Sequence, residues 1–542
     1  MPSPTIIFFN FHLTTLPCRA IIFVRKRQGD LTMENCPINI RYYSGYIRNF
    51  KNLCKELGLS EGMSRVQREE EILKAAYLKW GADMPAHLCG AFAFAIEDHE
   101  KKTLFVARDQ VGQKQMFYTV AGEDLICSGD IDAIANDPRV EKKLNLRMLQ
   151  QYLFYGYPIG EETFYENICK LRPGHSLLWN GEEIRIQRYF APTFAPDRSK
   201  SIDEYAENLR RVVNEILDEE RQDKELPYKE SFLSGGVDSS YLLAAGDAQA
   251  ANTVGYEDSG FDESALARET AKTLNKNFNV KQISPEEYFE RIPTVIDKMG
   301  QPLGDASAVA FSLGCQAAKE HTDIVYSGEG IDEFFGGYNA HRRHLPDDWI
   351  YLSCSHIMSE EVVRSLMKDF NDKVKAADPI LPLWEEAKDF EELDQKLYID
   401  ISLWLEGDIY LNTDRTSTAC GIELHTPFSD VRLFEAARVI PPEYLFCEEQ
   451  NKYVFRKAAS EKLPAEVAFR KKVGFPVPVR KWLSDSRYNS RVKEKLFGKT
   501  AERFFRMDEL ASMWNRFIEG EDLLWNRIYA IYVFILWYEL KF

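Results

Sequence analysis

Short apolar runs separated by turn signals occupy much of the first 190 residues of the chain. The predicted strands are 90–96, 103–107, 116–118, 176–179 and 184–189. Gly112 and the pair Asn180-Gly181 mark turns between such runs. Helical periodicity appears at 67–80 and 146–154. The pattern predicts a mostly antiparallel, β-rich domain with few helices.

A second pattern begins after residues 191–201, which contain two prolines and no periodicity, and within which we place a linker at 193–201. The helical segments beyond it include 202–222, 241–246, 263–274 and 285–299. The candidates for buried parallel strands are 230–233, 253–256 and 323–326. This alternation predicts a doubly wound α/β layer with a helical extension over residues 202–542.

Residues 1–32 stand apart from both patterns. Their apolar stretch, residues 5–24, is interrupted by polar residues and a proline, and the basic residues 25–27 follow it. A secretory signal carries its basic residues before the apolar stretch, so this order argues against one, and a membrane anchor is a weak alternative. We expect residues 1–32 to be a leader or a non-native extension, with the first domain at 33–192.

The composition favours a folded protein that acts on small molecules. Hydrophobic residues make up 45% and charged residues 28% of the 542 residues, near the averages of soluble globular chains. The 85 acidic residues outnumber the 68 basic ones, and the net charge of −17 disfavours nucleic acid and anionic membranes as partners. A nucleotide stays compatible with this charge, because backbone amides, one lysine and Mg²⁺ suffice to bind a triphosphate. The ten cysteines form no CxxC pair, so we expect free thiols in a reducing, cytoplasmic compartment.

The segment Ser234-Gly235-Gly236-Val237-Asp238-Ser239-Ser240 carries the strongest chemical signal. It follows a strand candidate and precedes a helix, so backbone N–H groups and a helix N-terminus meet there and form an anion site. Asp238 would repel a bare phosphate, which suits a ligand to Mg²⁺ on that phosphate or an N-cap. An ordinary strand-to-helix turn is the alternative, but the full string favours a nucleotide. No lysine follows the glycines, so this is not the Walker loop of ATPases and kinases.

A second loop, residues 326–338, places Glu329, Asp332 and Glu333 among four glycines. A solvated acidic turn is the alternative interpretation of this cluster. The loop follows the strand candidate 323–326, and the carboxyl ends of parallel strands bind ligands at one sheet edge. We therefore expect both loops to lie at the same edge.

Together the two loops resemble those of asparagine synthetases, which belong to the ATP pyrophosphatase superfamily. Further motifs in the family's order are 301–307, 413–417, 421–428 and 470–476. The resemblance covers the whole second half of the chain. It implies an AMP-forming ligase that uses ATP and Mg²⁺: a carboxylate is adenylated with release of pyrophosphate, and ammonia or an amine then attacks.

The resemblance also implies a nucleotide site. Leu233 and Val254 would border the adenine, and Ser327 with Gly328 would line the ribose and the α-phosphate. The residues implied to bind pyrophosphate are Ser234, Gly235, Gly236, Asp238, Ser239 and Ser240.

The catalytic residues implied by the resemblance are Glu329, Lys472 and Asp332. Asp238 and Asp332 would hold Mg²⁺. Glu329 would accept a proton from the attacking amine, and Lys472 would neutralise charge on the α-phosphate during adenylation.

Two positions on the substrate side depart from the family. Where the family commonly has a Lys two residues before its Asp-Arg pair, this chain has Asn412, and His425 replaces a usual Arg. Aspartate is the expected acid substrate, and either change could loosen its binding more than that of ATP.

Residues 33–192 resemble the family's class II glutamine amidotransferase domain, which has an Ntn-hydrolase-like fold. The matching motifs are 90–95, 107–114 and 172–175. Ser44-Gly45-Tyr46 aligns with the family's glutamine-binding Asn-Gly-Glu, and Arg68 stands where a glutamine-binding acid is usual. Residue 2 is Pro and residue 34 is Glu, so no N-terminal Cys is formed, and Cys36 is the one candidate replacement. We expect a degenerate domain without a glutaminase nucleophile.

Three functions fit these features. The expected one converts aspartate to asparagine with free ammonia, or with ammonia from a separate glutaminase. The second is a cyclising amide ligase of the lasso-peptide cyclase or β-lactam synthetase type, and Glu329 argues against the β-lactam branch, whose members carry Tyr there. The third is a catalytically silent scaffold, against which the intact loops argue. The expected partners are small-molecule substrates, with a homodimer as a further expectation.

Overall fold

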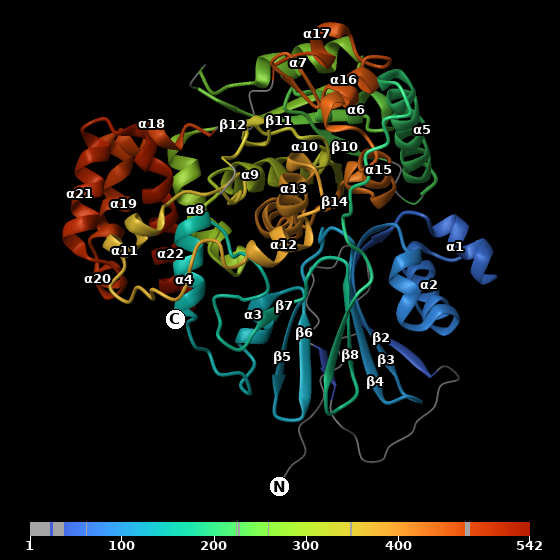
Figure 1. Cartoon of the computed structure of the whole chain (residues 1–542), viewed down its shortest axis with the longest axis horizontal. Helices are drawn as coiled ribbons and strands as arrows, with labels where there is room; N and C mark the ends of the chain where they lie inside the picture. Colours follow the sequence, from blue (N-terminus) through green and yellow to red (C-terminus); the bar gives the residue numbers. More distant parts are fainter. Residues whose placement is uncertain are drawn as a thin grey trace.

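The chain folds into a β-rich N-terminal half and an α/β C-terminal half that pack against each other (Figure 1). The computed structural model describes residues 22–24 and 37–542, except residues 61, 224, 226–227, 258–259, 347–348 and 472–476. The architecture changes between β9 (Ile184–Arg188) and α5 (Ile202–Arg221).

Two antiparallel sheets form the N-terminal half. The first has the order β2 (Ile38–Ile47), β3 (Gly90–Asp98), β4 (Thr103–Arg108), β8 (His175–Trp179) and β9. The second has the order β1 (Ile22–Val24), β6 (Asp124–Ser128), β5 (Phe117–Ala121) and β7 (Cys169–Lys170). Every neighbouring pair in both sheets is antiparallel. The predicted β-rich domain is confirmed, and its five predicted strands correspond to β3, β4, β5, β8 and β9.

Strand β1 lies within residues 1–32, the predicted leader. Its backbone pairs with residues 125–127 of β6. These three residues therefore join a sheet of the first domain, and a boundary at residue 33 stays a prediction. Met33 and Cys36 lie outside the described residues.

Alternation along β3 buries both faces of the first sheet. Ala93 and Ala95 face the second sheet, whereas Phe92 and Phe94 face a pair of helices, as successive residues of a strand must. The helices of this half are α1 (Phe50–Leu57), α2 (Arg65–Trp80), α3 (Ile131–Ala135) and α4 (Leu146–Tyr155). The pair on the first sheet is α1 and α2, and α3 packs on β5 and β6 of the second sheet. The layers run helix, sheet, sheet, helix.

The C-terminal half is built on a parallel sheet. Its order is β12 (Asn277–Ile283), β11 (Ala250–Tyr256), β10 (Glu230–Phe232), β13 (Ile324–Tyr326) and β14 (Glu423–His425), and every neighbouring pair is parallel. The order reverses between β10 and β13, and ligands bind beyond the carboxyl ends of strands at such a point. The predicted doubly wound layer is confirmed, and its two chemical loops follow these two central strands.

Helices surround this sheet and continue into the predicted helical extension. Those around the sheet are α5, α6 (Val237–Ala245), α7 (Ser264–Thr273), α8 (Pro285–Met299), α9 (Ser307–Lys319) and α10 (Ile331–Phe335). The later elements are α11 (Glu360–Leu366), α12 (Leu381–Glu386), α13 (Glu392–Ile399), a π-helix (Asp400–Ile409), α14 (Tyr410–Ala419), α15 (Val431–Ala437), β15 (Phe446–Cys447), β16 (Gln450–Asn451), α16 (Tyr453–Ala459), α17 (Ala465–Ala468), α18 (Val479–Ser484), α19 (Ser486–Leu496), α20 (Lys499–Phe504), α21 (Met507–Ile518) and α22 (Trp525–Lys541). Within the described ranges, no helix combines the length and apolar character that a membrane crossing requires.

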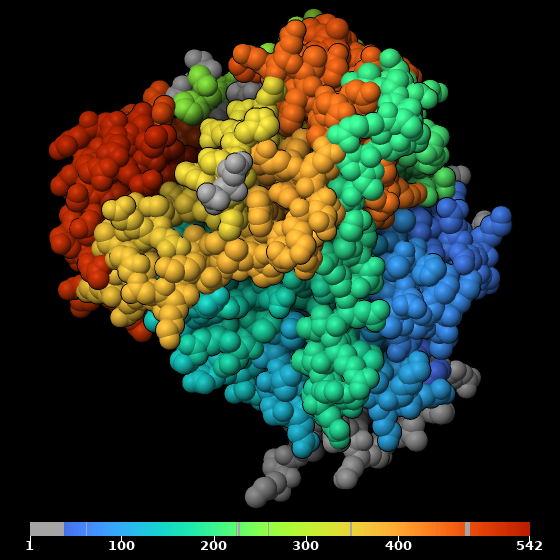
Figure 2. All heavy atoms as spheres, viewed as in Figure 1, coloured from blue at the N-terminus to red at the C-terminus, as the bar shows by residue number. Residues whose placement is uncertain are grey.

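The segment predicted as a linker, residues 193–201, is bound to the C-terminal half. The Ala195 N–H donates to the Arg438 carbonyl at 3.0 Å, and the Asp197 N–H donates to the Val439 carbonyl at 2.8 Å. Figure 2 shows the chain around these residues, in green, crossing the surface from one half to the other. The connection is therefore part of the packed structure.

Buried ion pairs join the two halves. Arg108 Nη1 lies 3.3 Å from Glu406 Oε2, and Lys170 Nζ lies 2.7 Å from Glu406 Oε1. Lys114 Nζ lies 2.9 Å from Asp414 Oδ1. All five side chains are at most 9% exposed. Removing one partner of such a pair would leave a buried charge, so the first domain is energetically tied to the second.

Candidate active site

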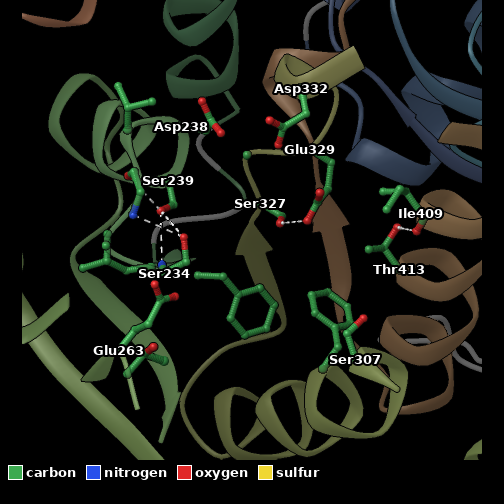
Figure 3. A pocket seen from close by; sticks show the side chains of 18 of the residues that line it. Ser234, Asp238, Ser239, Glu263, Ser307, Ser327, Glu329, Asp332, Ile409 and Thr413 are labelled. Atoms are coloured by element: carbon green, nitrogen blue, oxygen red, sulfur yellow. Dashed lines mark hydrogen bonds between the residues drawn. The ribbon is translucent and has the colours of Figure 1, made fainter. Parts of the chain in front are cut away.

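The two chemical loops meet at the reversal point of the parallel sheet and line one cavity of about 500 Å³ (Figure 3). The predicted site residues that line it are Leu233, Ser234, Gly235, Gly236, Asp238, Ser239, Val254, Ser327, Gly328, Glu329 and Asp332. The structure thus brings together residues that are almost 100 positions apart in the sequence.

The first loop is held in a tight turn by a left-handed glycine and by hydrogen bonds with its neighbours. Gly235 has φ +79°, a left-handed conformation that favours glycine. The Gly235 carbonyl accepts a hydrogen bond from Arg470 Nη1 at 3.0 Å. Ser239 Oγ accepts from the Ser234 N–H at 3.1 Å, which closes the loop onto the first turn of α6. The loop and the start of α6 line the cavity together, at the place where an anion site was predicted.

One predicted site residue that the structure describes, Ser240, is not among those that line the cavity. Ser240 is fully buried on α6, and its N–H donates to the Gly236 carbonyl at 3.1 Å within the helix. Its backbone donor is therefore engaged by the helix itself. Lys472 lies outside the described residues.

The second loop places Glu329 between the two ends of the cavity (Figure 3). The Ser327 hydroxyl donates to Glu329 Oε1 at 2.9 Å, and the Ser429 hydroxyl donates to the Glu329 carbonyl at 2.9 Å. A Cβ atom at Gly328 would lie 3.2 Å from the Ser239 nitrogen, tighter than ordinary contacts. Glycine there lets the second loop approach the start of α6 closely.

A lysine that the sequence patterns did not single out lies at the centre of the site. Lys452 Nζ lies 2.5 Å from Asp238 Oδ2 and 2.9 Å from Asp332 Oδ1. Its side chain is 1% exposed, and its backbone is left-handed, with φ +58°. Burial alone would lower the pKa of Lys452, but the charges of Asp238 and Asp332 outweigh it and raise this pKa. Lys452 is therefore a buried cation between the predicted metal ligands.

One weak signal for Lys452 exists in the sequence. The residue directly precedes α16, and a cation is disfavoured at a helix N-terminus. Its presence there needs another cause, and the two carboxylates supply it.

Asp238 and Asp332 also fit Mg²⁺ held jointly with phosphate. Mg²⁺ in nucleotide sites takes one or two carboxylates together with phosphate oxygens and water. Both carboxylates face the cavity, and they are 18% and 21% exposed. Among the described residues, no group of three or more His, Cys, Asp or Glu side chains could hold a metal ion. Mg²⁺ at Asp238 and Asp332 would therefore need phosphate oxygens as further ligands.

The end of the cavity opposite the phosphate loop is formed by the start of α9 and by α14. Ser307 and Thr413 lie on this side in Figure 3. Asn412 lines the wall there, and its Nδ2 donates to Asp305 Oδ2 at 3.4 Å and to Ser307 Oγ at 3.3 Å. Burial raises the pKa of Asp305 in spite of these donors. The first departure from the family is therefore a neutral amide on the cavity wall.

The second departure, His425, lies at the boundary between the halves. Its Nδ1 is 2.8 Å from Glu220 Oε2, and its Nε2 is 2.5 Å from Glu423 Oε1. The ring stacks on Tyr46 at a centroid distance of 3.8 Å. Burial alone would lower the pKa of His425, but Glu220 and Glu423 outweigh it and raise this pKa. Any effect of His425 on the substrate is indirect, because it does not line the cavity.

Tyr46, at one predicted glutamine-handling position, belongs to this boundary. Its hydroxyl accepts hydrogen bonds from Arg48 Nη2 at 2.9 Å and from the Thr426 N–H at 3.1 Å. Arg48 is buried, and it pairs with Glu220 at 2.7 Å and with Asp430. The Tyr46 side chain therefore makes contacts with the C-terminal half.

Ser44 and Arg68, the other two positions predicted from the resemblance to handle glutamine, also make contacts within the fold. The Arg68 guanidinium lies 3.8 Å from the centre of the Phe50 ring, and its Nη2 donates to Asp223 Oδ2 at 3.0 Å. Ser44 lies opposite Ala93 in the pairing of β2 with β3.

Comparisons with known proteins identify the family of the chain. The family described as asparagine synthase matches residues 203–539, and the glutamine amidotransferase domain matches residues 19–190. The glutamine-hydrolyzing asparagine synthetase 1 of Bacillus subtilis (strain 168) is 27% identical over 92% of this chain and 85% of its own length. Asparagine synthetase 3 of the same organism is 26% identical over 80% of this chain and 75% of its own.

One solved structure shares only a distant likeness. The glutamine phosphoribosylpyrophosphate amidotransferase of B. subtilis, in complex with ADP and GMP, is 14% identical, with a TM-score of 0.21 over 48% of this chain and 47% of that chain. The fold described above rests instead on the strand order of this chain. Because the asparagine synthase match spans more than half of the sequence, the chain belongs to the asparagine synthase family and is a carbon–nitrogen ligase of the asparagine synthetase type.

Proposed function

We propose that this chain adenylates a carboxylic acid with ATP and couples the adenylate to ammonia or an amine, without hydrolysing glutamine itself. The convergence of the phosphate loop, Lys452 and Glu329 on one cavity carries the proposal. Aspartate is the first acid to test, because the relatives are named as asparagine synthetases.

In the first step, a carboxylate oxygen of the acid bonds to the α-phosphorus of ATP, and the bond to pyrophosphate breaks. The loop 234–239 suits the departing pyrophosphate, because its N–H groups and hydroxyls can donate to an anion. Leu233 and Val254 would border the adenine, and Ser327 with Gly328 would line the ribose and α-phosphate; all four line the cavity.

Lys452 would neutralise the charge that grows on the phosphates as pyrophosphate leaves. Its ammonium is held by Asp238 and Asp332 beside the phosphate loop, so it needs no reorganisation during the step. We assign to Lys452 the role that the family resemblance suggested for Lys472.

Asp238 and Asp332 would hold Mg²⁺ when nucleotide binds. The ion would shield the negative charge of the triphosphate. The two carboxylates would orient it against the loop, with Lys452 as a third charged group between them.

In the second step, the amine forms the carbon–nitrogen bond, the acyl–oxygen bond to AMP breaks, and the amine loses a proton. Glu329 would accept that proton; its position between the phosphate loop and the Ser307 end of the cavity supports this role (Figure 3). The hydrogen bond from Ser327 fixes its carboxylate in that position.

The first domain would support the ligase without supplying ammonia. By the family resemblance, Tyr46 and Arg68 stand at two glutamine-binding positions. Their side chains instead hydrogen-bond to Thr426 and Asp223 within the fold. Ammonia or an amine would come from solution or from a separate protein.

The test supplies ¹⁵N either as ammonium chloride or in the amide of glutamine. We expect labelled amide from ammonium and no glutamate from glutamine. The Lys452→Met variant serves as the control, because it should lose amide formation but would not affect a contaminating glutaminase. Glutamate release in step with amide formation would contradict the proposal.

A further inference from the structure

Two motifs of the sequence, residues 107–114 and 413–417, meet at the boundary between the halves. Lys114 Nζ lies 2.9 Å from Asp414 Oδ1, and the N–H of the next residue, Gln115, donates to Asp414 Oδ2 at 3.1 Å. Both charged side chains are at most 9% exposed. Asp414 does not line the cavity, so its carboxylate serves the contact between the halves.

The turn that carries Lys114 is fixed by its own hydrogen bonds. Asp109 Oδ1 accepts the N–H groups of Gly112 at 2.8 Å and of Gln113 at 2.9 Å, and its Oδ2 accepts the Lys114 N–H at 3.0 Å. Arg108 Nη2 donates to the Gly112 carbonyl at 2.9 Å. Arg108 and Asp109 are fully buried. A turn held in this way places the lysine precisely.

Two further polar contacts hold the same region of the C-terminal half. Arg415 follows Asp414 on α14, and its Nη2 donates to Asp130 Oδ1 at 2.9 Å. Glu406 of the π-helix accepts a hydrogen bond from Lys170 Nζ at 2.7 Å. The N-terminal half therefore binds both α14 and the π-helix that precedes it.

An aromatic contact adds to the grip on the π-helix. The Tyr157 ring of the N-terminal half lies with its centre 5.5 Å from that of Trp404, and a Cβ atom at Gly407 would lie 2.8 Å from two atoms of the Tyr157 ring. Glycine thus permits the close approach. π-Helices are rare and mostly a single turn long, so one of ten residues depends on contacts with its surroundings.

The same two elements form one wall of the active-site cavity. They contribute Trp404, Ile409, Asn412 and Thr413 to its lining. The Thr413 hydroxyl donates to the Ile409 carbonyl at 2.9 Å and joins the elements. Asp414 directly follows Thr413, and Glu406 lies two residues after Trp404. Because helices transmit displacements along their length, fixing Asp414 and Glu406 fixes this wall.

We propose that the N-terminal half is a structural part of the ligase site, and that Lys114 is a positioning residue. It holds α14 through Asp414 and so sets Asn412 and Thr413 on the cavity wall opposite the phosphate loop. This role gives a use to a domain that, by the proposed function, does not hydrolyse glutamine. Only the expected effect on the acid rests on the proposed function, because the contacts themselves do not depend on the reaction.

Hydrogen exchange of the full chain, read by mass spectrometry, tests the positioning without turnover. Lys114→Met should speed exchange in residues 410–419 at least about tenfold and change that of residues 237–245, in α6, by less than about twofold. Arg147→Met is the control, because Arg147 Nη2 lies 3.5 Å from Asp378 Oδ2 across the same boundary but its side chain is 45% exposed. It should leave both segments unchanged.

Equal acceleration in both segments of Lys114→Met would show general destabilisation and overturn the proposal, as would no acceleration in residues 410–419. If Lys114→Met does not fold, its combination with Asp414→Asn, which also removes the carboxylate of the pair, is measured instead. The same pattern is expected there, and the same two outcomes would overturn the proposal.

ATP–pyrophosphate exchange then shows which substrate is affected. Lys114→Met should lower kcat/KM for the acid about 10- to 100-fold and keep KM for ATP within about threefold, because displacement of the wall misorients the acid alone. Lys114→Arg, which keeps the cation, should recover most of the loss. Equal loss for acid and ATP, or full activity in Lys114→Met, would overturn the role. Absence of exchange with every acid in the unmodified chain would instead contradict the proposed function, and hydrogen exchange would still decide the role of Lys114.

Discussion

Replacing Lys452 by Met should lower ATP–pyrophosphate exchange by about two to three orders of magnitude. The side chain is 1% exposed, and its ammonium lies within 2.9 Å of both Asp238 and Asp332. A preorganised donor of this kind contributes about 3–4 kcal/mol to the transition state. In the variant, two carboxylates would also face the triphosphate without their shared cation.

The assay follows labelled pyrophosphate into ATP at saturating acid, and kcat/KM is compared between variants. Lys471→Met is the matched control, because Lys471 also lines the cavity but its side chain is 87% exposed. We expect that control to stay within about threefold of the unmodified chain. Thermal unfolding with bound ATP separates lost chemistry from lost fold.

The same substitution at Lys472 tests the alternative assignment. If Lys472→Met loses exchange while Lys452→Met keeps more than a tenth of it, the role assigned here to Lys452 is wrong.

Three further predictions concern the base and the boundary between the halves. Glu329→Gln should keep exchange while amide formation falls about 10²- to 10⁴-fold, and equal loss of both would remove Glu329 as the base. Arg48→Met should lower the free energy of unfolding in denaturant by about 3–5 kcal/mol, because it removes the buried guanidinium that pairs with both Glu220 and Asp430. Arg185→Met, at a 71% exposed side chain, should change it by less than about 1 kcal/mol. The pKa of His425 is raised in the fold, so its stabilisation is complete below pH 6.5 and is lost as the pH rises through the folded pKa. Unfolding midpoints should therefore fall at alkaline pH in the unmodified chain more than in His425→Gln, and parallel pH profiles would refute this linkage.

Apolar runs identified strands such as β3 and β4 from the sequence. β3 is such a run because helices cover one of its faces and a second sheet covers the other. β12 was not predicted, because it lies at the sheet edge and its residues 277–282 are only partly buried or exposed, which gives it alternating polar positions. β14 has three residues, two of them charged or polar, and it forms through pairing with β13. A strand that depends on pairing with a strand far away in the sequence shows no recognisable pattern in its own residues.

The site was predictable where its residues are contiguous. Each phosphate-side loop is a single stretch of sequence, and parallel topology brings the two together. Lys452 joins the site from 120 residues beyond Asp332, outside any motif, and its weak signal before α16 does not indicate which groups it contacts. Asn412 was recognised as a departure from the family, but its contact with Asp305 depends on the packing of α14 against α9.

The products formed from ATP test the proposed chemistry most directly. Phosphorus NMR of a reaction containing the purified chain, ATP, Mg²⁺, ammonium and a carboxylic acid substrate distinguishes the two ways in which a ligase cleaves ATP. We predict AMP and pyrophosphate in equal amounts, dependent on the acid, because the loop at Gly235 lacks a Walker lysine and Lys452 lies beside Asp238 of that loop. Formation of ADP and inorganic phosphate would contradict adenylation.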